Sequence, residues 1–96
     1  MPDSFLAATV AVHVVYLARL RETLGATEET VTVKVDGRDA TVEDVVAALV
    51  SRGGAWASEL ATGRAVRVAV NHAMTKRSAA IRSGDEVAFF PTVTGG

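Results

Sequence analysis

Hydrophobic and polar residues alternate along this chain with periods that predict several β-strands. Residues 10–17 are almost continuously apolar and rich in β-branched side chains, which is typical of a central strand buried on both faces. Residues 30–35 and 66–70 show the period-2 alternation of half-exposed strands. A shorter apolar run at residues 87–90 predicts the last strand.

A principal helix is predicted between the second and third of these strands. Thr41 and Asp44 have the spacing of a capping box, and the valines and leucines that follow occupy one helical face. Gly53 and Gly54 provide the stop signal. Shorter helical segments are indicated by Leu17, Leu20, Leu24 and Gly25, and again by Trp56 and Leu60.

One long helix packed on a mixed sheet of four or five strands buries these apolar faces, which is an α+β architecture. The strand–helix–strand passage is compatible with a right-handed crossover. A polar connector follows Asn71, and within it Met74 and Ile81 are the expected contact residues. This pattern does not distinguish among α+β folds.

The end of the printed sequence has unusual chemistry. After Glu86 no side chain is charged, and Pro91 marks the point where a tail leaves the last strand. Gly95 and Gly96 lack a Cβ, so the backbone there is a narrow and pliable thread. A free α-carboxylate has a pKa of about 3.5 and is a poor electrophile. Chemistry at Gly96 would therefore need another enzyme to activate it, for instance as an acyl-adenylate.

Residues 84–96, GDEVAFFPTVTGG, resemble the C-terminus of the MoaD-like family of molybdopterin synthase small subunits. The family pattern is G-D-E-V-A-F-F-P-P-V-x-G-G, and this chain departs from it at Thr92, where a second proline is usual. The resemblance extends back through residues 68–71 and is found again at residues 16–25. It covers most of the chain, and residues 84–96 are its most specific part.

The resemblance implies a β-grasp, ubiquitin-like sulfur carrier. Residues 1–8 are then a mobile N-terminal extension, residues 9–91 the β-grasp domain, and residues 92–96 the flexible carrier tail. It further implies that a MoeB-like activating enzyme uses ATP to adenylate Gly96, and that a sulfur donor converts the adenylate into a thiocarboxylate. The tail would then deliver sulfur to the pterin precursor of the molybdenum cofactor, inside a MoaE-like large subunit that carries the catalytic residues. The expected setting is a cytoplasmic heterotetramer, with no cofactor bound to this chain.

A docking surface should accompany the tail. By resemblance, the family's hydrophobic contact patch corresponds here to Leu17, Met74 and Phe90. The adjacent Phe89 and Phe90 must point to opposite sides of a strand. We assign Phe89 to the core and Phe90 to the interface. The predicted partner-binding set is completed by Pro91, Val93 and Thr94, and the reacting terminus by Gly95 and Gly96.

Composition narrows the functional classes. The chain has 96 residues, of which 49% are hydrophobic, and this is enough for one packed domain. A net charge of −1 argues against nucleic-acid binding. The chain lacks cysteine, and His13 and His72 match no common metal-ligand spacing, so no metal is expected. The apolar residues 5–18 lack the preceding positive charge of a signal peptide and are too few to span a bilayer.

Three alternatives share parts of this pattern. The chain could carry sulfur for thiamin or cysteine synthesis, or it could be a ubiquitin-like modifier ligated to lysines. It could also be a β-grasp interaction domain without terminal chemistry. The sequence does not name the sulfur donor, nor does it choose between molybdenum and tungsten forms of the cofactor.

Overall fold

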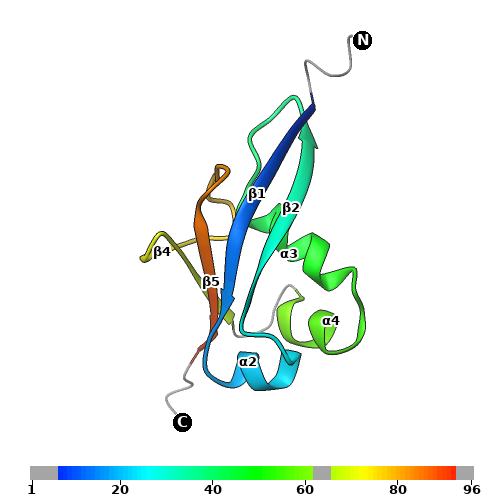
Figure 1. Ribbon diagram of the computed structural model, residues 1–96, viewed down its shortest axis with the longest axis vertical. Helices are drawn as coiled ribbons and strands as arrows, with labels where there is room; N and C mark the ends of the chain where they lie inside the picture. Colours follow the sequence, from blue (N-terminus) through cyan, green and yellow to red (C-terminus); the bar gives the residue numbers. More distant parts are fainter. Residues whose placement is uncertain (1–6, 62–65, 93–96) are drawn as a thin grey trace.

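The computed structural model describes residues 7–61 and 66–92, which form one mixed sheet and three helices (Figure 1). The strands are β1 (Ala7–Tyr16), β2 (Glu28–Asp36), β3 (Val66–Val70), β4 (Ala73–Thr75) and β5 (Glu86–Pro91), in the spatial order β2-β1-β5-β3-β4. The helices are α2 (Arg19–Leu24), α3 (Val42–Val50) and α4 (Gly54–Leu60). β1 already begins at Ala7, within the segment predicted as an N-terminal extension.

The sheet is mixed because its first and last strands lie side by side. β1 and β5 pair in parallel, whereas the β1–β2, β3–β5 and β3–β4 pairs are antiparallel. Figure 1 shows α3 and α4 together on one side of this sheet. A mixed five-stranded sheet grasping one main helix confirms the predicted β-grasp architecture.

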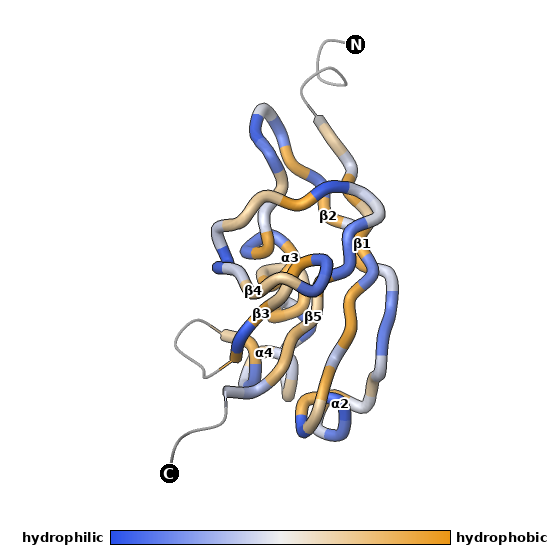
Figure 2. The backbone as a smooth tube through the Cα atoms, turned by 90° about the vertical axis from the view of Figure 1, so that its left-hand side faces the viewer, coloured by the Kyte–Doolittle hydropathy of each residue, from blue (hydrophilic) through white to orange (hydrophobic). Residues whose placement is uncertain are grey.

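The core lies between the sheet and α3. Alternation in β2 turns every second residue inward, and the three valines at these positions, Val31, Val33 and Val35, are all buried. The helix contributes the face predicted from its spacing, through Val42, Val45, Val46 and Leu49. Ile81, from the long connector before β5, is buried as well. In Figure 2 the hydrophilic residues gather at turns and loops around this apolar centre.

The prediction that residues 10–17 are buried on both faces is wrong. Val12, Val14 and Tyr16 are at most 1% exposed, whereas His13 is exposed and Val15 is half-buried. The helices cover only one face of the sheet, so the alternate side chains of β1 lie on the other, open face. The β-branched run at 10–17 therefore indicates a strand in the interior of the sheet, but not a strand that is buried on both faces.

The connector after Asn71 contains a strand that the sequence did not reveal. Asn71 and His72 both have positive φ, 50° and 72°, and they form a two-residue turn that pairs β3 with β4. Consecutive positive φ values are the geometry of the tight hairpin turns. Met74 consequently lies on an edge strand and not in a connector, and it is 51% exposed.

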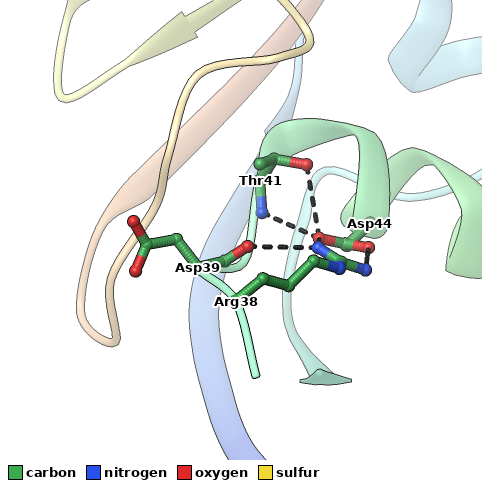
Figure 3. A network of polar contacts seen from close by, with 4 residues as sticks. All are labelled: Arg38, Asp39, Thr41 and Asp44. Carbon is green, nitrogen blue, oxygen red and sulfur yellow. Dashed lines mark hydrogen bonds and ion pairs between the residues drawn. The ribbon is translucent and has the colours of Figure 1, made fainter. Parts of the chain in front are cut away.

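The start of α3 is fixed by a polar network around Asp44 (Figure 3). The Asp44 carboxylate accepts a hydrogen bond from the Thr41 backbone N–H at 2.8 Å, as the predicted capping box requires. Arg38 donates to both Asp44 oxygens, at 2.7 and 2.8 Å. The Arg38 hydrogen bonds are the main reason why the pKa of Asp44 is lowered to about 2. Helix α3 is thereby held at the end that follows β2.

Candidate functional site

An apolar row crosses the open face of the sheet. Residues directly opposite one another in neighbouring strands share a face. The register places Val15 of β1 opposite Ala88 of β5, Ala88 opposite Ala69 of β3, and Ala69 opposite Met74 of β4. Ala69 and Ala88 are buried although they do not belong to the core under α3. Four adjacent strands therefore present one continuous apolar row to the open side.

A second row lies nearer the end of β5. The Leu17 N–H donates to the Phe89 carbonyl at 3.0 Å, which continues the β1–β5 pairing for one more residue. Because alternation turns Tyr16 into the core, Leu17 faces the open side, and it is 39% exposed. Phe90 is half-buried on the same side. We call the two rows together the apolar patch, which consists of Val15, Leu17, Ala69, Met74, Ala88 and Phe90.

The structure brings together the three residues assigned to a contact patch. Leu17, Met74 and Phe90 come from three different strand regions and lie on one face. Leu17 and Met74 are the only large hydrophobic side chains that are exposed among residues 8–61 and 66–92. Ala69 and Ala88 were not identified from the sequence, because alanine carries no signal of its face. Exposed apolar area of this kind marks a binding surface.

Phe89 belongs to the core, as predicted. It is 1% exposed, and its ring stacks on Tyr16 with centroids 6.5 Å apart and planes inclined by 16°. Tyr16 in turn meets Trp56 of α4 edge to face, at 5.4 Å and 70°. These three rings attach the end of β5 to the helical layer. The neighbouring Phe90 is thereby held facing outward.

A charged cluster supports those rings from the core side. The Tyr16 hydroxyl donates to Glu29 at 2.7 Å, and Arg52 donates to both Glu29 oxygens at 2.8 Å. The Arg52 guanidinium also lies 4.5 Å from the centre of the Trp56 ring. The Arg52 hydrogen bonds lower the pKa of Glu29, whereas burial and the Glu29 contact raise the pKa of Tyr16. The cluster joins β1, β2 and the α3–α4 region beside the end of β5.

The residues around the start of β5 have structural partners. Asp85 accepts hydrogen bonds from the Asn71 side chain at 3.0 Å and from the Arg82 N–H at 2.8 Å. The Asn71 bond is the main cause of the lowered pKa of Asp85. The Glu86 N–H donates to the Asn71 side-chain oxygen at 3.0 Å. Gly84 has a φ of +92°, a conformation that a residue with a side chain rarely adopts. The G-D-E part of the motif therefore positions β5.

The tail begins where the sheet ends. Pro91 is the last residue of β5 and lies opposite Val66, as the predicted exit point requires. Val93, Thr94, Gly95 and Gly96 lie outside the described residues. Their predicted roles in partner binding and in the reaction stay predictions. The apolar patch is thus next to the strand from which these residues continue.

The two histidines form surface pairs with nearby acids. His13 Nε2 lies 2.5 Å from Glu28, and His72 Nε2 lies 3.7 Å from Glu86. Within residues 7–61 and 66–92, no three His, Cys, Asp or Glu side chains are grouped so that they could hold a metal ion. None of the helices in those ranges has the length and apolar character needed to span a bilayer.

Comparison with known proteins decides the family. The model of the ThiS family matches residues 14–96. This chain belongs to the ThiS family. The assignment confirms the sulfur-carrier relationship that residues 84–96 predicted.

Two curated relatives of this ThiS-family chain are molybdopterin synthase sulfur carrier subunits. The protein from Haemophilus influenzae is 36% identical and aligns over 88% of this chain and 98% of that protein. The protein from Escherichia coli is 35% identical and aligns over 88% of this chain and 99% of that protein. Among solved structures, small archaeal modifier protein 1 from H. volcanii is 35% identical, with a TM-score of 0.65 over 88% of this chain and 99% of that one.

Proposed function

We propose that this protein is the sulfur-carrying small subunit of a molybdopterin synthase. The proposal rests on one juxtaposition: the exposed apolar patch lies beside the end of β5, from which the chain continues to Gly95 and Gly96. It is supported by two relatives, each at least 35% identical, that are named as sulfur carrier subunits of this enzyme. An apolar docking surface next to a thin tail is what a carrier needs.

The carboxyl group of Gly96 is the proposed site of chemistry. In an activating enzyme the carboxylate attacks the α-phosphate of ATP and displaces pyrophosphate, which gives an acyl-adenylate, a good electrophile. Hydrosulfide supplied by a sulfur donor then attacks the acyl carbon and displaces AMP, which leaves a thiocarboxylate on Gly96. Side chains bulkier than those of Gly95 and Gly96 would obstruct entry of this group into a narrow active site.

The apolar patch is the proposed docking surface for the large subunit. Burying Leu17, Met74 and Phe90 against a partner would hold the tail at that partner's active site and raise its effective concentration there. The large subunit would supply the catalytic side chains and bind the pterin precursor. The assembly would be a cytoplasmic heterotetramer, and the same patch would dock on the activating enzyme at another stage.

A second candidate function is supported by a specific observation. A relative of 35% identity is named small archaeal modifier protein 1, so a protein with this fold can also be a protein modifier. In that case the activated Gly96 would form isopeptide bonds with lysines of other proteins. Sulfur carriage for thiamin or cysteine synthesis uses the same thiocarboxylate and differs only in its acceptor.

The intact mass of the protein tests the proposal. The protein is co-expressed with its activating enzyme and a sulfur source, next to a variant that lacks Gly96. The expected result is a mass gain equal to the replacement of one oxygen by sulfur in the full chain only. Lysine-linked adducts with no such gain would favour the modifier instead. An unchanged mass, while an established carrier is converted in parallel, would contradict both.

A further inference from the structure

The strand register places three charged side chains at the border of the apolar patch, within the described strands. Glu28 of β2 lies opposite Val15, and Glu86 precedes Ala88 by two residues in β5. Arg67 of β3 lies directly opposite Phe90. Alternation in β3 also puts Arg67 on the same face as Ala69. Arg67 therefore has apolar patch residues beside it and along its own strand.

These three charges differ in their partners. Glu28 contacts His13 at 2.5 Å, and Glu86 contacts His72 at 3.7 Å. Arg67 is exposed and forms no ion pair or side-chain hydrogen bond with any other described residue. Four other arginines in the described ranges donate side-chain hydrogen bonds to acids or backbone carbonyls, namely Arg19, Arg38, Arg52 and Arg77. Arg67, by contrast, lies on the open face of the sheet beside the apolar patch.

Arg67 fills the corner of the patch between Phe90 and Ala69. β3 is flanked by β5 on one side and by β4 on the other. Phe90 lies directly opposite Arg67, and Met74 lies opposite Ala69, two residues further along β3, so a partner that covers both side chains comes against Arg67. Docking would then remove part of the water around the guanidinium group. A charge that loses its water without gaining a partner opposes association strongly.

We propose that Arg67 is a specificity determinant, and that the partner covering the apolar patch presents an Asp or Glu carboxylate to it. The guanidinium offers a planar pair of donors that fits a carboxylate in two parallel hydrogen bonds. Apolar contact is supplied by Leu17, Met74 and Phe90. Arg67 favours binding only to surfaces that have an acidic side chain opposite it. This inference rests on the proposed function, since it describes the partner of the same patch.

The affinity of the purified large subunit of the proposed molybdopterin synthase tests this inference. Binding is measured by calorimetry for the wild type, for Arg67→Met and for the matched control Lys34→Met. Both variants lose one positive charge from an exposed position on the open face, but Lys34 lies in β2, opposite Thr9 and outside the patch. Because Arg67 is exposed, thermal unfolding of both variants should match that of the wild type.

The direction in which Arg67→Met changes the affinity decides between the two possibilities. If a carboxylate faces Arg67, Arg67→Met leaves that carboxylate unpaired and weakens binding by about 30-fold or more. The control should change the affinity by less than about threefold. If the partner offers only apolar surface, the added methionine leaves the affinity unchanged or raises it, and the inference is overturned. Absence of binding by the wild type would overturn the proposed function, and this inference with it.

Discussion

Substitutions of the two adjacent phenylalanines at the end of β5 should affect different properties, one the folding stability and the other the binding of a partner. Phe89 is 1% exposed and stacks on Tyr16, whereas Phe90 is half-buried on the open face. We expect Phe89→Ala to lower the free energy of unfolding and Phe90→Ala to weaken binding of the partner. The two variants remove the same atoms, one residue apart, so each serves as the control for the other.

The expected sizes follow from burial. Truncating a buried phenylalanine to alanine costs about 3–5 kcal/mol, through lost transfer energy and the cavity that remains. A domain of this size is stable by roughly 5–15 kcal/mol, so Phe89→Ala removes a large part of that margin. It should lower the melting temperature by at least about 12 °C. For Phe90→Ala, which empties no core site, we expect a loss of about 1 kcal/mol or less.

Urea denaturation followed by Trp56 fluorescence measures the free energies, and calorimetry with the large subunit measures the affinities. Trp56 is a suitable reporter because its ring contacts Tyr16, which in turn contacts Phe89. Equal destabilisation by the two variants would refute the assignment of opposite faces. So would a Phe90→Ala variant that binds the large subunit as tightly as the wild type.

Three further predictions concern the capping network, the charged cluster and the patch. The pKa of the Asp44 carboxyl group is lowered from 3.8 to about 2. The ionised carboxylate therefore adds about 2 kcal/mol to the free energy of unfolding above pH 4, and this contribution is lost as the pH falls through 2. Urea titrations of wild type and Asp44→Asn should accordingly differ by that amount at pH 6 and converge near pH 2. Arg52→Ala removes both hydrogen bonds to Glu29 and should destabilise the protein by about 1–2 kcal/mol, measured in the same way; an unchanged midpoint would show that the cluster contributes nothing. Met74→Ser alters a side chain that is 51% exposed, so its free energy of unfolding should stay within about 0.5 kcal/mol of the wild-type value. Its affinity for the large subunit, measured by calorimetry, should fall by about tenfold. An unaltered affinity would show that Met74 is not part of the docking surface.

The elements that the sequence predicted well are those specified by local signals. The valine alternation in residues 30–35 and the capping box of Thr41 and Asp44 depend only on neighbours within a few residues, and both are present as expected. The carrier tail at residues 92–96 was also predicted from a contiguous motif, and its role stays a prediction. The opposite faces of Phe89 and Phe90 follow from the geometry of any strand.

The features that escaped prediction depend on distant parts of the chain. Whether β1 is covered on one face or two depends on how many helical layers the fold builds, and residues 10–17 carry no information about that. β4 has only three residues, too few for a period to be recognised. Arg67 lies opposite Phe90 only because the β3–β5 register brings together residues far apart in sequence. The alternation of residues 66–70 could have predicted that Arg67 and Ala69 lie on one face, but it could not have predicted which residues of neighbouring strands lie beside them.

Sulfur transfer in a single turnover tests the central claim most directly. The thiocarboxylated protein is mixed with the large subunit and the pterin precursor, and the intact mass of the carrier is followed together with sulfur in the pterin. The account predicts that the carrier returns to its carboxylate mass as the pterin gains sulfur, and that both changes require the large subunit. A thiocarboxylate that persists in the complete mixture, or that is lost equally fast without the large subunit, would contradict it.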